Sequence, residues 1–274
     1  MPLLPPRWRV LVLVLVGVSL PIAAGVAWLL LSGTFDRVHG LLPVEGFAPE
    51  NWRFLREPIG GRPPIAVALV NSLIFAGVVA TAEVLIASMA AYAISRLSFP
   101  GRSWYLGLVL VLHAFPAVSL IIAIFYILRL LGLFDTLIGV IIVKASLELP
   151  LGIWLMKGFF DNLSWDMEMA ALVDGMSRWT LFWKIALPMV RPGILALGTF
   201  ALLSAWGEFI LPFTLIVSGR SWTMAMYLQT LLGEAFTDYG MVAAVGLFYA
   251  IPVLAMFLLG QRYLLNIYAG GAKG

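Results

Sequence analysis

The chain has 274 residues, of which 62% are hydrophobic and only 11% are charged, and its formal net charge is +3. Soluble domains carry roughly 25% charged residues, so this chain has too little charge to cover a water-soluble surface and is expected to lie in a membrane. The sequence contains no cysteine, which excludes disulfides, thiol nucleophiles and Cys-ligated metals. Its two histidines, His39 and His113, are far apart, so no histidine metal site is expected.

Six apolar stretches are each long enough, at about 20 residues, to cross a bilayer as a helix. We expect transmembrane helices over residues 10–32, 65–95, 103–127, 137–156, 193–218 and 240–259. Pro116 interrupts the third of these stretches and Pro150 lies inside the fourth, and membrane helices tolerate internal prolines because neighbouring groups satisfy the freed carbonyls. The predicted fold class is an all-α integral membrane protein with six transmembrane helices, in a single domain over residues 1–274.

The first apolar stretch follows Arg7 and Arg9, as the apolar region of a secretory signal would. It is longer than the roughly 7–15 apolar residues of such a signal, and further spans follow it. We therefore interpret it as an uncleaved first helix.

The distribution of lysine and arginine predicts the orientation, because these residues concentrate in cytoplasmic loops. With the N-terminus inside, the inner segments carry Arg7, Arg9, Arg96, Arg102, Lys157, Arg178, Lys184, Arg191, Arg262 and Lys273. The outer segments carry Arg37, Arg53, Arg56, Arg62, Arg129 and Arg220, partly balanced by Asp36, Glu45, Glu50, Glu57, Asp135, Glu234 and Asp238. The bias predicts a multi-pass protein of the inner or plasma membrane with both termini in the cytoplasm.

Two polar segments interrupt the apolar pattern. Residues 33–64 form an external loop rich in glycine and proline, in which residues 49–55 are expected to form a short surface helix. The other segment, residues 157–191, is cytoplasmic in the predicted orientation. The sequence shows no internal repeat and no low-complexity tract.

The cytoplasmic segment begins with the signals of a short helix. Ser164 is a suitable N-cap, and Asp166 and Glu168 follow in the first turn, where the helix dipole favours anions. Gly175 is suited to end this helix as a C-cap.

A second short helix is expected to begin after Ser177 and to stop at Pro188. Both expected helices carry large apolar side chains: Met167, Met169 and Leu172 in the first, and Trp179, Phe182 and Trp183 in the second. A cytosolic loop has little reason to expose such a surface, so part of it is expected to dock on a partner. The alternative is an amphipathic hairpin that lies on the membrane surface or packs on its own bundle.

The spacing of this segment resembles the EAA loop of ABC-importer permeases. That pattern is Glu-Ala-Ala, three residues, Gly, nine residues, then Ile-x-Leu-Pro, and here it reads Met169-Ala170-Ala171, Gly175 and Ile185-Ala186-Leu187-Pro188. Met169 stands where the motif has glutamate, and Glu168 is expected to offer the missing charge from an adjacent face. The resemblance implies an interface with an ATPase through Glu168, Met169, Ala170, Ala171, Asp174, Gly175, Ile185, Leu187 and Pro188.

Further segments extend the resemblance over nearly the whole chain: residues 71–72, 90–93, 96–102, 131–136, 206–209, 261–264 and 269–274. Together they are similar to the second, MalG-type permease subunit of carbohydrate-uptake ABC importers. The resemblance implies the type I importer permease fold, with a core over about residues 67–262 and a coupling loop over 164–188. It also implies a C-terminal tail, 263–274, that reaches the ATPase dimer through Gly270, Gly271 and Lys273.

The same resemblance implies the partners: a MalF-type permease subunit, two cytosolic ATPase subunits, an extracytoplasmic solute-binding protein, a sugar-like solute and membrane lipid, with no nucleic acid. The chain itself has no GxxxxGK[ST] phosphate loop, so it is not expected to hydrolyse ATP in that way or to act as an enzyme. We expect it to bind no cofactor or metal, with ATP and Mg on the partner ATPase.

Ionisable side chains at membrane depth are costly and are candidates for function. Glu83 lies within the second predicted span, Lys144 and Glu148 lie four residues apart on one face of the fourth, and Glu208 lies beside Trp206 in the fifth. These five residues are candidates for the translocation path. The competing interpretation is that Lys144 and Glu148 form a buried pair that fixes helix packing, with Glu83 pairing to Lys144 across helices.

Two further expectations concern rings in the membrane. His113 is expected to be a hydrogen-bonded core residue of the third span. Most aromatic residues are expected to face lipid or the interface, and Trp206 is the aromatic candidate for contact with a sugar.

These features predict the permease subunit of an ATP-driven importer. The solute is expected to be a sugar or sugar-like molecule, such as an oligosaccharide, polyol or glycoside, carried into the cytoplasm by alternating access. One alternative is an importer of a charged sugar derivative of the glycerol-phosphate type. Another is a proton-coupled secondary carrier that uses Glu83, Glu148 and His113, although such carriers often contain repeats. An intramembrane enzyme is a third, but its usual motifs are missing from the sequence.

Overall fold

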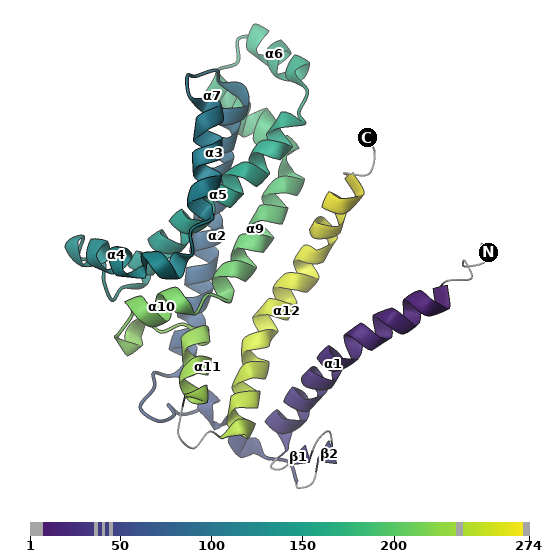
Figure 1. The fold of residues 1–274 in the computed structure, drawn as a ribbon, viewed down its shortest axis with the longest axis vertical. Helices are drawn as coiled ribbons and strands as arrows, with labels where there is room; N and C mark the ends of the chain where they lie inside the picture. Colours follow the sequence, from purple (N-terminus) through teal and green to yellow (C-terminus); the bar gives the residue numbers. More distant parts are fainter. Residues whose placement is uncertain (1–7, 36–37, 40–41, 44–45, 234–237, 271–274) are drawn as a thin grey trace. The chain divides into compact units, whose positions relative to one another are not determined.

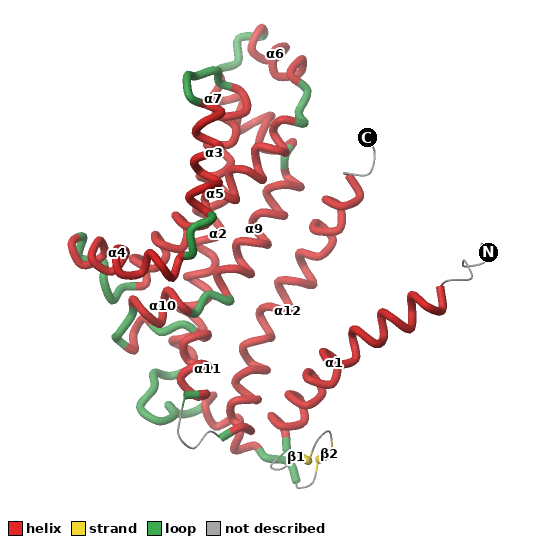
Figure 2. Tube along the Cα trace, viewed as in Figure 1, coloured by secondary structure: helices red, strands yellow, loops and turns green. Residues whose placement is uncertain are grey.

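The computed structural model describes residues 8–35, 38–39, 42–43, 46–233 and 238–270, which are mostly helical (Figures 1 and 2). The long helices are α1 (Trp8–Thr34), α2 (Ile65–Arg96), α5 (Leu137–Asp161), α9 (Arg191–Trp206) and α12 (Tyr239–Gly270). The shorter ones are η1 (Pro49–Leu55), α3 (Arg102–His113), α4 (Ala117–Leu130), α6 (Trp165–Val173), α7 (Arg178–Leu181), η2 (Phe182–Ala186), α8 (Leu187–Met189), α10 (Ile210–Leu215), η3 (Gly219–Ser221) and α11 (Met224–Leu232). Two short antiparallel strands, β1 (Val38–His39) and β2 (Leu42–Pro43), form a hairpin.

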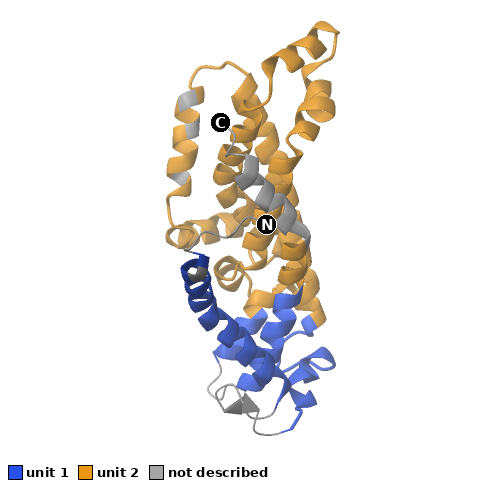
Figure 3. Cartoon of the chain, turned by 90° about the vertical axis from the view of Figure 1, so that its right-hand side faces the viewer, with its two compact units in different colours: residues 1–65, 227–251 blue, residues 66–226, 252–274 orange. Residues whose placement is uncertain are grey.

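The chain divides into two compact units (Figure 3). Unit 1 comprises residues 1–65 and 227–251, and unit 2 comprises residues 66–226 and 252–274.

Unit 1 is held by contacts between the end of α1, the segment after it and the first part of α12. A Cβ placed on Gly33 would lie 3.1 Å from the backbone nitrogen of Ala244, so glycine permits close approach of the two helices. The Trp52 indole donates to the Gly33 carbonyl at 2.8 Å, and the Arg62 Nε donates to Thr230 Oγ1 at 2.9 Å. The segment over residues 33–64 is therefore fastened to its unit at both ends.

The short helix predicted over residues 49–55 is present as the 3-10 helix η1. It lies at the surface, since Pro49, Glu50, Arg53 and Leu55 are exposed, and its inner face buries Asn51 and Phe54. The Asn51 amide donates to the Ser32 carbonyl at 3.3 Å, and the ring of Phe54 lies 5.9 Å from that of Phe248. The expectation of a short surface helix is confirmed, and these two side chains anchor it in unit 1.

Unit 2 is a bundle in which α3 and α9 lie beside α5 (Figure 1). Small side chains of α2, such as Ala87 and Ala91, pack with larger ones of α5 and the coupling segment, such as Met156, Phe160 and Leu181. Because dispersion contacts require close approach, these small residues let the helix backbones come together.

Four described helices are long and apolar enough to cross a membrane: α1, α2, α5 and α12. A fifth span results if residues Arg178–Met189 and Arg191–Trp206, which are bent by 76° at their junction, are counted as one. The all-α prediction is confirmed, but six uninterrupted transmembrane helices are not found in the described part of the chain.

Two of the predicted spans are broken. The stretch 103–127 divides into α3 and α4, with Pro116 at the N-cap of α4. Proline removes a backbone donor and disfavours helical conformation in the residue before it, which explains the break. The stretch 193–218 divides into α9 and α10 at residues 207–209, and extended backbone follows α10 at Ile216. By contrast, Pro150 lies inside the continuous helix α5, as expected.

Candidate functional site

The predicted coupling segment, residues 164–188, folds as two helical pieces joined by a glycine turn. α6 ends at Val173, and Gly175 has a φ of +87°. The Gly175 N–H donates to the Leu172 carbonyl and the Met176 N–H donates to the Ala171 carbonyl, both at 3.1 Å. These two bonds form a Schellman motif, whose left-handed position is best occupied by glycine. The expectation that Gly175 ends this helix is confirmed.

The second helical piece begins as predicted but continues further. Ser177 caps α7 by accepting a backbone N–H at 3.1 Å. Helical backbone then runs through the π-helical turn η2 and through α8, so the expectation that Pro188 stops the helix is wrong. Proline cannot bond to the carbonyl four residues earlier, and the wider π turn immediately before it accommodates that loss. The chain changes direction only at Val190, before α9.

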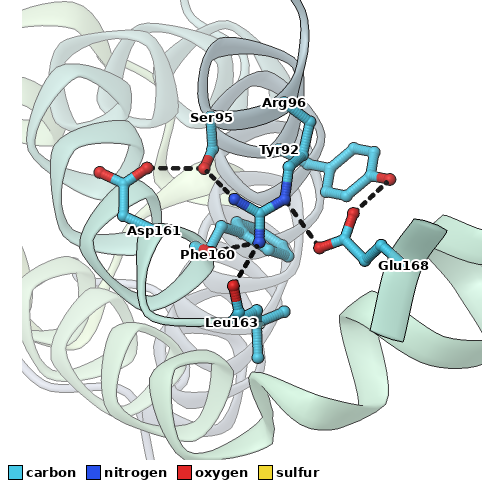
Figure 4. Close-up of polar contacts among 7 residues, drawn as sticks. All are labelled: Tyr92, Ser95, Arg96, Phe160, Asp161, Leu163 and Glu168. Carbon is cyan, nitrogen blue, oxygen red and sulfur yellow. Dashed lines mark hydrogen bonds and ion pairs between the residues drawn. The ribbon is translucent and has the colours of Figure 1, made fainter. Parts of the chain in front are cut away.

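Arg96, the last residue of α2, joins α6 to the bundle of unit 2 (Figure 4). Its Nε donates to Glu168 Oε1 at 2.7 Å, and the two side chains are 7% and 5% exposed. A terminal nitrogen of Arg96 donates to the carbonyls of Phe160, at 2.7 Å, and Leu163, at 3.1 Å. The Tyr92 hydroxyl donates to Glu168 Oε2 at 3.3 Å. One guanidinium thus holds the ends of α2, α5 and α6 together.

Neighbouring groups fix the orientation of this guanidinium. Its remaining terminal nitrogen donates to Ser95 Oγ at 3.2 Å, and Ser95 in turn donates to Asp161 Oδ1 at 2.6 Å (Figure 4). The ring of Trp165 lies 5.5 Å from the Arg96 guanidinium carbon, within the range of a cation–π contact. Breaking such a buried pair leaves an uncompensated charge, so the network specifies where α6 sits.

α6 has an inner face and an outer face. Ala171 and Leu172 pack against the buried cluster of α2, α5 and α7. Met169 and Val173, spaced four residues apart, are 39% and 82% exposed. Residues at this spacing lie on one side of a helix, so α6 presents an apolar stripe away from its own bundle.

The residues expected at an ATPase interface fall into three groups. Met169, Ala170, Asp174 and Gly175 are exposed, whereas Ala171, Ile185, Leu187 and Pro188 are half-buried. Glu168 is 4% exposed and faces Arg96, so the expectation that it offers its charge outward is corrected. Successive helical residues are rotated by about 100°, which places Glu168 and Met169 on different sides of α6.

The predicted C-terminal contact lies largely outside the described residues. α12 ends at Gly270, and Gly271 and Lys273 are not described. The contact of this tail with an ATPase therefore stays a prediction.

At membrane depth, a lysine lies between two carboxylates. Lys144 Nζ is 2.8 Å from Glu148 Oε1 and 2.7 Å from Glu208 Oε2. Ser204 donates to Glu148, and the Leu211 N–H donates to Glu208 Oε1 at 3.2 Å. The predicted pair on α5 is confirmed, with Glu208 as a third member. This ion cluster, Lys144, Glu148 and Glu208, ties α5 to the break between α9 and α10.

Glu83 neither pairs with Lys144 nor lines the cavity beside the ion cluster. It is 1% exposed on α2, and Lys144 forms its ion pairs with Glu148 and Glu208 instead. A Cβ placed on Gly152 would lie 2.8 Å from Glu83 Oε1, so the carboxyl group packs against the α5 backbone. Neither of its oxygens has a hydrogen-bond donor among the described residues.

A cavity of about 330 Å³ opens beside the ion cluster. Its wall comes from the break between α3 and α4, from α5, and from the break between α9 and α10: His113, Ala114, Phe115, Pro116, Ala117, Lys144, Leu147, Glu148, Glu208 and Leu211. Non-helical backbone at membrane depth is tolerated where it is buried in protein or lines a cavity. Both helix breaks line the same cavity.

Two expectations about rings are corrected at this cavity. His113 Nδ1 bonds to the Leu147 carbonyl at 3.1 Å, as expected, but the ring is exposed at the cavity instead of lying in the core. Trp206 is 2% exposed and is not among the cavity-lining residues, so it is not the aromatic contact for a solute in this structure. Phe115, 55% exposed, faces the cavity instead.

Sequence reasoning missed Phe115 and Arg96 as residues of these sites. Pro116 signalled a break, and an exposed aromatic beside a break is a clue to a cavity wall. The sequence presents Arg96 as a predicted cytoplasmic charge and as the first residue of the similar segment 96–102, with no partner indicated. Its role depends on Glu168, which is 72 residues away in sequence, and no local pattern reveals that pairing.

Three features together indicate a subunit of a membrane transport system. They are the apolar helices of spanning length, the broken helices around a membrane-depth cavity, and the helix pair with an exposed apolar stripe. A family model described as "binding-protein-dependent transport system inner membrane component" matches residues 83–265. The chain belongs to this family. It is thus a multi-pass permease subunit of the ABC-importer class, as the coupling-loop pattern predicted.

Similar proteins of this kind cover most of the chain. The maltose/maltodextrin transport system permease protein MalG of Salmonella typhimurium is 30% identical over 96% of this chain and 94% of its own length. The trehalose transport system permease protein SugB of Mycobacterium tuberculosis is 31% identical over 76% of this chain and 77% of its own length. The diacetylchitobiose uptake system permease protein NgcG of Streptomyces coelicolor is 30% identical over 86% of this chain and 78% of its own length.

A solved structure shows the same fold. A chain of a bacterial ABC transporter involved in the import of the acidic polysaccharide alginate has a TM-score of 0.81 to this chain at 20% sequence identity, over 96% of this chain and 99% of its own. The expected type I importer permease fold is confirmed.

Proposed function

We propose that this chain is the permease subunit through which an ATP-driven importer passes a sugar or sugar-like solute into the cytoplasm by alternating access. The support for a sugar is that relatives named for trehalose, maltose and diacetylchitobiose each match three quarters or more of the chain. Oligosaccharides, polyols and glycosides share the hydroxyl groups that such a path would recognise.

The observation that carries the coupling part of the proposal is the arrangement of α6. Its inner face is fastened to α2 and α5 through Glu168 and Arg96, while Met169 and Val173 stay exposed on its outer face. A helix held on one side and exposed on the other can pass a movement of a docked partner to the bundle. We propose that the partner is an ATPase subunit.

The remaining parts of the complex follow from this role. Two cytosolic ATPase subunits would hold ATP and Mg, a MalF-type permease would complete the path, and an extracytoplasmic solute-binding protein would deliver the solute. Closure of the ATPase dimer would move the docked helices, and the two permeases would rock between inward-open and outward-open states. The tail around Gly271 and Lys273 would add a second contact with the ATPase.

The charges in the cavity bear on the solute class. Lys144 already pairs with Glu148 and Glu208, so an anionic solute would meet carboxylates beside an engaged lysine. Like charges repel strongly in a low-dielectric site. This arrangement supports a neutral sugar over a phosphorylated or otherwise anionic derivative.

Uptake by the assembled complex tests the proposal. The complex, with its solute-binding protein, is reconstituted in liposomes with ATP, and accumulation of radiolabelled maltose, trehalose and diacetylchitobiose is measured. A matched complex carries an ATPase subunit that binds but cannot hydrolyse ATP. We expect accumulation of at least one sugar only with the active ATPase. Sustained accumulation with the inactive one, or uptake of none of the sugars, would overturn the proposal.

A further inference from the structure

We propose that the cavity between the two helix breaks is a solute-binding site of this subunit, in which Phe115 stacks on a sugar ring and His113, Lys144 and Glu208 hydrogen-bond to its hydroxyl groups. This inference rests on the proposed function and adds the place and chemistry of recognition. The four side chains all line the cavity of about 330 Å³ within unit 2.

The apolar part of the site comes from the break between α3 and α4. Phe115 is 55% exposed although it lies next to a helix end at membrane depth. The walls of small-molecule sites consist mostly of apolar and aromatic side chains, with a few polar groups at defined positions. A sugar ring has an apolar C–H face, which an aromatic ring can cover, and an edge of hydroxyl groups.

The polar part of the site offers both donors and acceptors. A lysine ammonium has three N–H donors, and Lys144 uses two on Glu148 and Glu208. A carboxylate has about four lone-pair positions, and Glu208 uses two, one for Lys144 and one for the Leu211 N–H. Each group therefore keeps capacity to bond a hydroxyl, which can donate and accept at once.

His113 adds an acceptor to the cavity wall. Its Nδ1 must carry the proton, because its partner, the Leu147 carbonyl, can only accept. In the neutral ring, Nε2 is then an acceptor for a hydroxyl. Neighbouring hydroxyl groups of a sugar would thus meet an acceptor, a donor and a carboxylate within one cavity.

The charge balance selects against anions. Lys144 is the sole lysine or arginine among the described cavity-lining residues, and it already pairs with the two carboxylates of Glu148 and Glu208. An anion would have to displace a carboxylate from Lys144. A neutral polyhydroxylated solute needs no such displacement. The volume lies near the lower end of the range of small-molecule pockets, roughly 300–1,000 Å³, which suits a small solute or one ring of a longer one.

The test uses the whole complex in liposomes and measures KM and kcat for uptake of maltose, trehalose and diacetylchitobiose. In Phe115→Ala the stacking surface is lost, and in His113→Asn the bond to Leu147 is kept while the Nε2 acceptor is removed. We expect each change to raise KM roughly fivefold to tenfold, as losing one aromatic contact or hydrogen bond would, with a smaller change in kcat. Phe200→Ala, an exposed aromatic of α9 outside the cavity, is the control and should leave KM unchanged.

The outcomes separate the two proposals. Wild-type uptake of none of the three sugars overturns the sugar-import function. Wild-type uptake with unchanged KM in both Phe115→Ala and His113→Asn overturns the binding site and leaves the function standing. A KM for maltose uptake that is equal in the wild type and in Phe115→Tyr, but raised in Phe115→Ala, supports the stacking role, because tyrosine retains the ring. Competition by glycerol 3-phosphate as strong as that by the sugars would overturn the selectivity for neutral solutes.

Discussion

Arg96 shows how a single side chain can position a functional element. Its planar guanidinium carries five N–H donors, and here they reach Glu168, Ser95 and two carbonyls at the end of α5. Helix C-terminal carbonyls attract cations, so the guanidinium serves α5 and α6 together. A lysine, with a compact point charge, could not make this set of contacts.

The buried pair between Arg96 and Glu168 should be costly to break. We expect Glu168→Ala to lower the free energy of unfolding by about 3–5 kcal/mol, because the guanidinium is left buried without its counter-charge. The double variant Arg96→Met with Glu168→Met should lose less than Glu168→Ala alone. Thermal unfolding of the purified complex, with protease cleavage around α6 as a local readout, measures both.

The control for this prediction is the more exposed pair of Lys157 and Asp161, whose side chains are 19% and 42% exposed. Lys157→Met should change stability by less than about 1 kcal/mol. If Glu168→Ala were as mild as Lys157→Met, the network would not be what positions α6.

Gly175 should be intolerant of a β-branched residue. At φ +87° an L-residue costs about 1–2 kcal/mol, and the Schellman turn sets the angle between α6 and α7. We expect Gly175→Val to reduce solute-stimulated ATP hydrolysis by the complex at least tenfold. Gly158→Ala, in the interior of α5 with open space around its added Cβ, is the matched control and should behave like the wild type. Normal stimulation in an intact Gly175→Val complex would rule out the role of this turn.

At the scale of elements, the two helix breaks are the informative features of unit 2. Pro116 separates α3 from α4, and residues 207–209 separate α9 from α10. Their meeting at one cavity comes from packing, since α4 and α10 both contact α5. Lys144 and Glu208, 64 residues apart, close the arrangement with an ion pair.

A second link between elements should depend on pH. Asp135 Oδ1 accepts the N–H groups of Val217 and Ser218, both at 2.7 Å, and so ties the turn after α4 to the segment after α10. The hydrogen bond from Ser218, opposed in part by desolvation, and the bond from Val217 hold the pKa of Asp135 below its ordinary value. Its ionised form therefore stabilises the fold above the ordinary pKa of about 3.9, and this contribution is lost as the pH falls through the lowered pKa.

The variant Asp135→Asn tests that link. Asparagine tolerates the positive φ of 62° at this position, so the backbone should be kept while the charge is removed. We expect the melting temperature of the variant to lie below that of the wild type at pH 7 and the difference to shrink toward pH 3. A difference that is the same at both pH values would contradict a role for the carboxylate charge.

At the scale of the whole molecule, the distribution of charge decides how the chain sits in a membrane. The Lys/Arg bias predicts that both termini and the coupling segment are cytoplasmic and that residues 33–64 are external. All parts of the proposed function depend on this orientation, because an ATPase can reach α6 only from the cytoplasm.

The absence of cysteine from the sequence makes the orientation directly testable. Single variants Glu57→Cys and Asp174→Cys each introduce one thiol at an exposed position. A membrane-impermeant maleimide added to intact cells with a permeable outer envelope should label Glu57→Cys, and should label Asp174→Cys only after the inner membrane is opened. The reverse pattern would overturn the predicted topology and the coupling role of α6.

Local sequence was enough to predict the apolar helices, the break at Pro116 and the turn at Gly175, because each depends on the chemistry of a residue and its near neighbours. The spacing of the coupling loop also predicted the family. Long-range packing decided the rest. It turned Glu168 inward to Arg96, buried Trp206, and brought Phe115, His113, Lys144 and Glu208 to one cavity. Residues 64 or 72 positions apart meet only when helices pack, and a low-dielectric interior then requires charges to find partners, which no local pattern specifies.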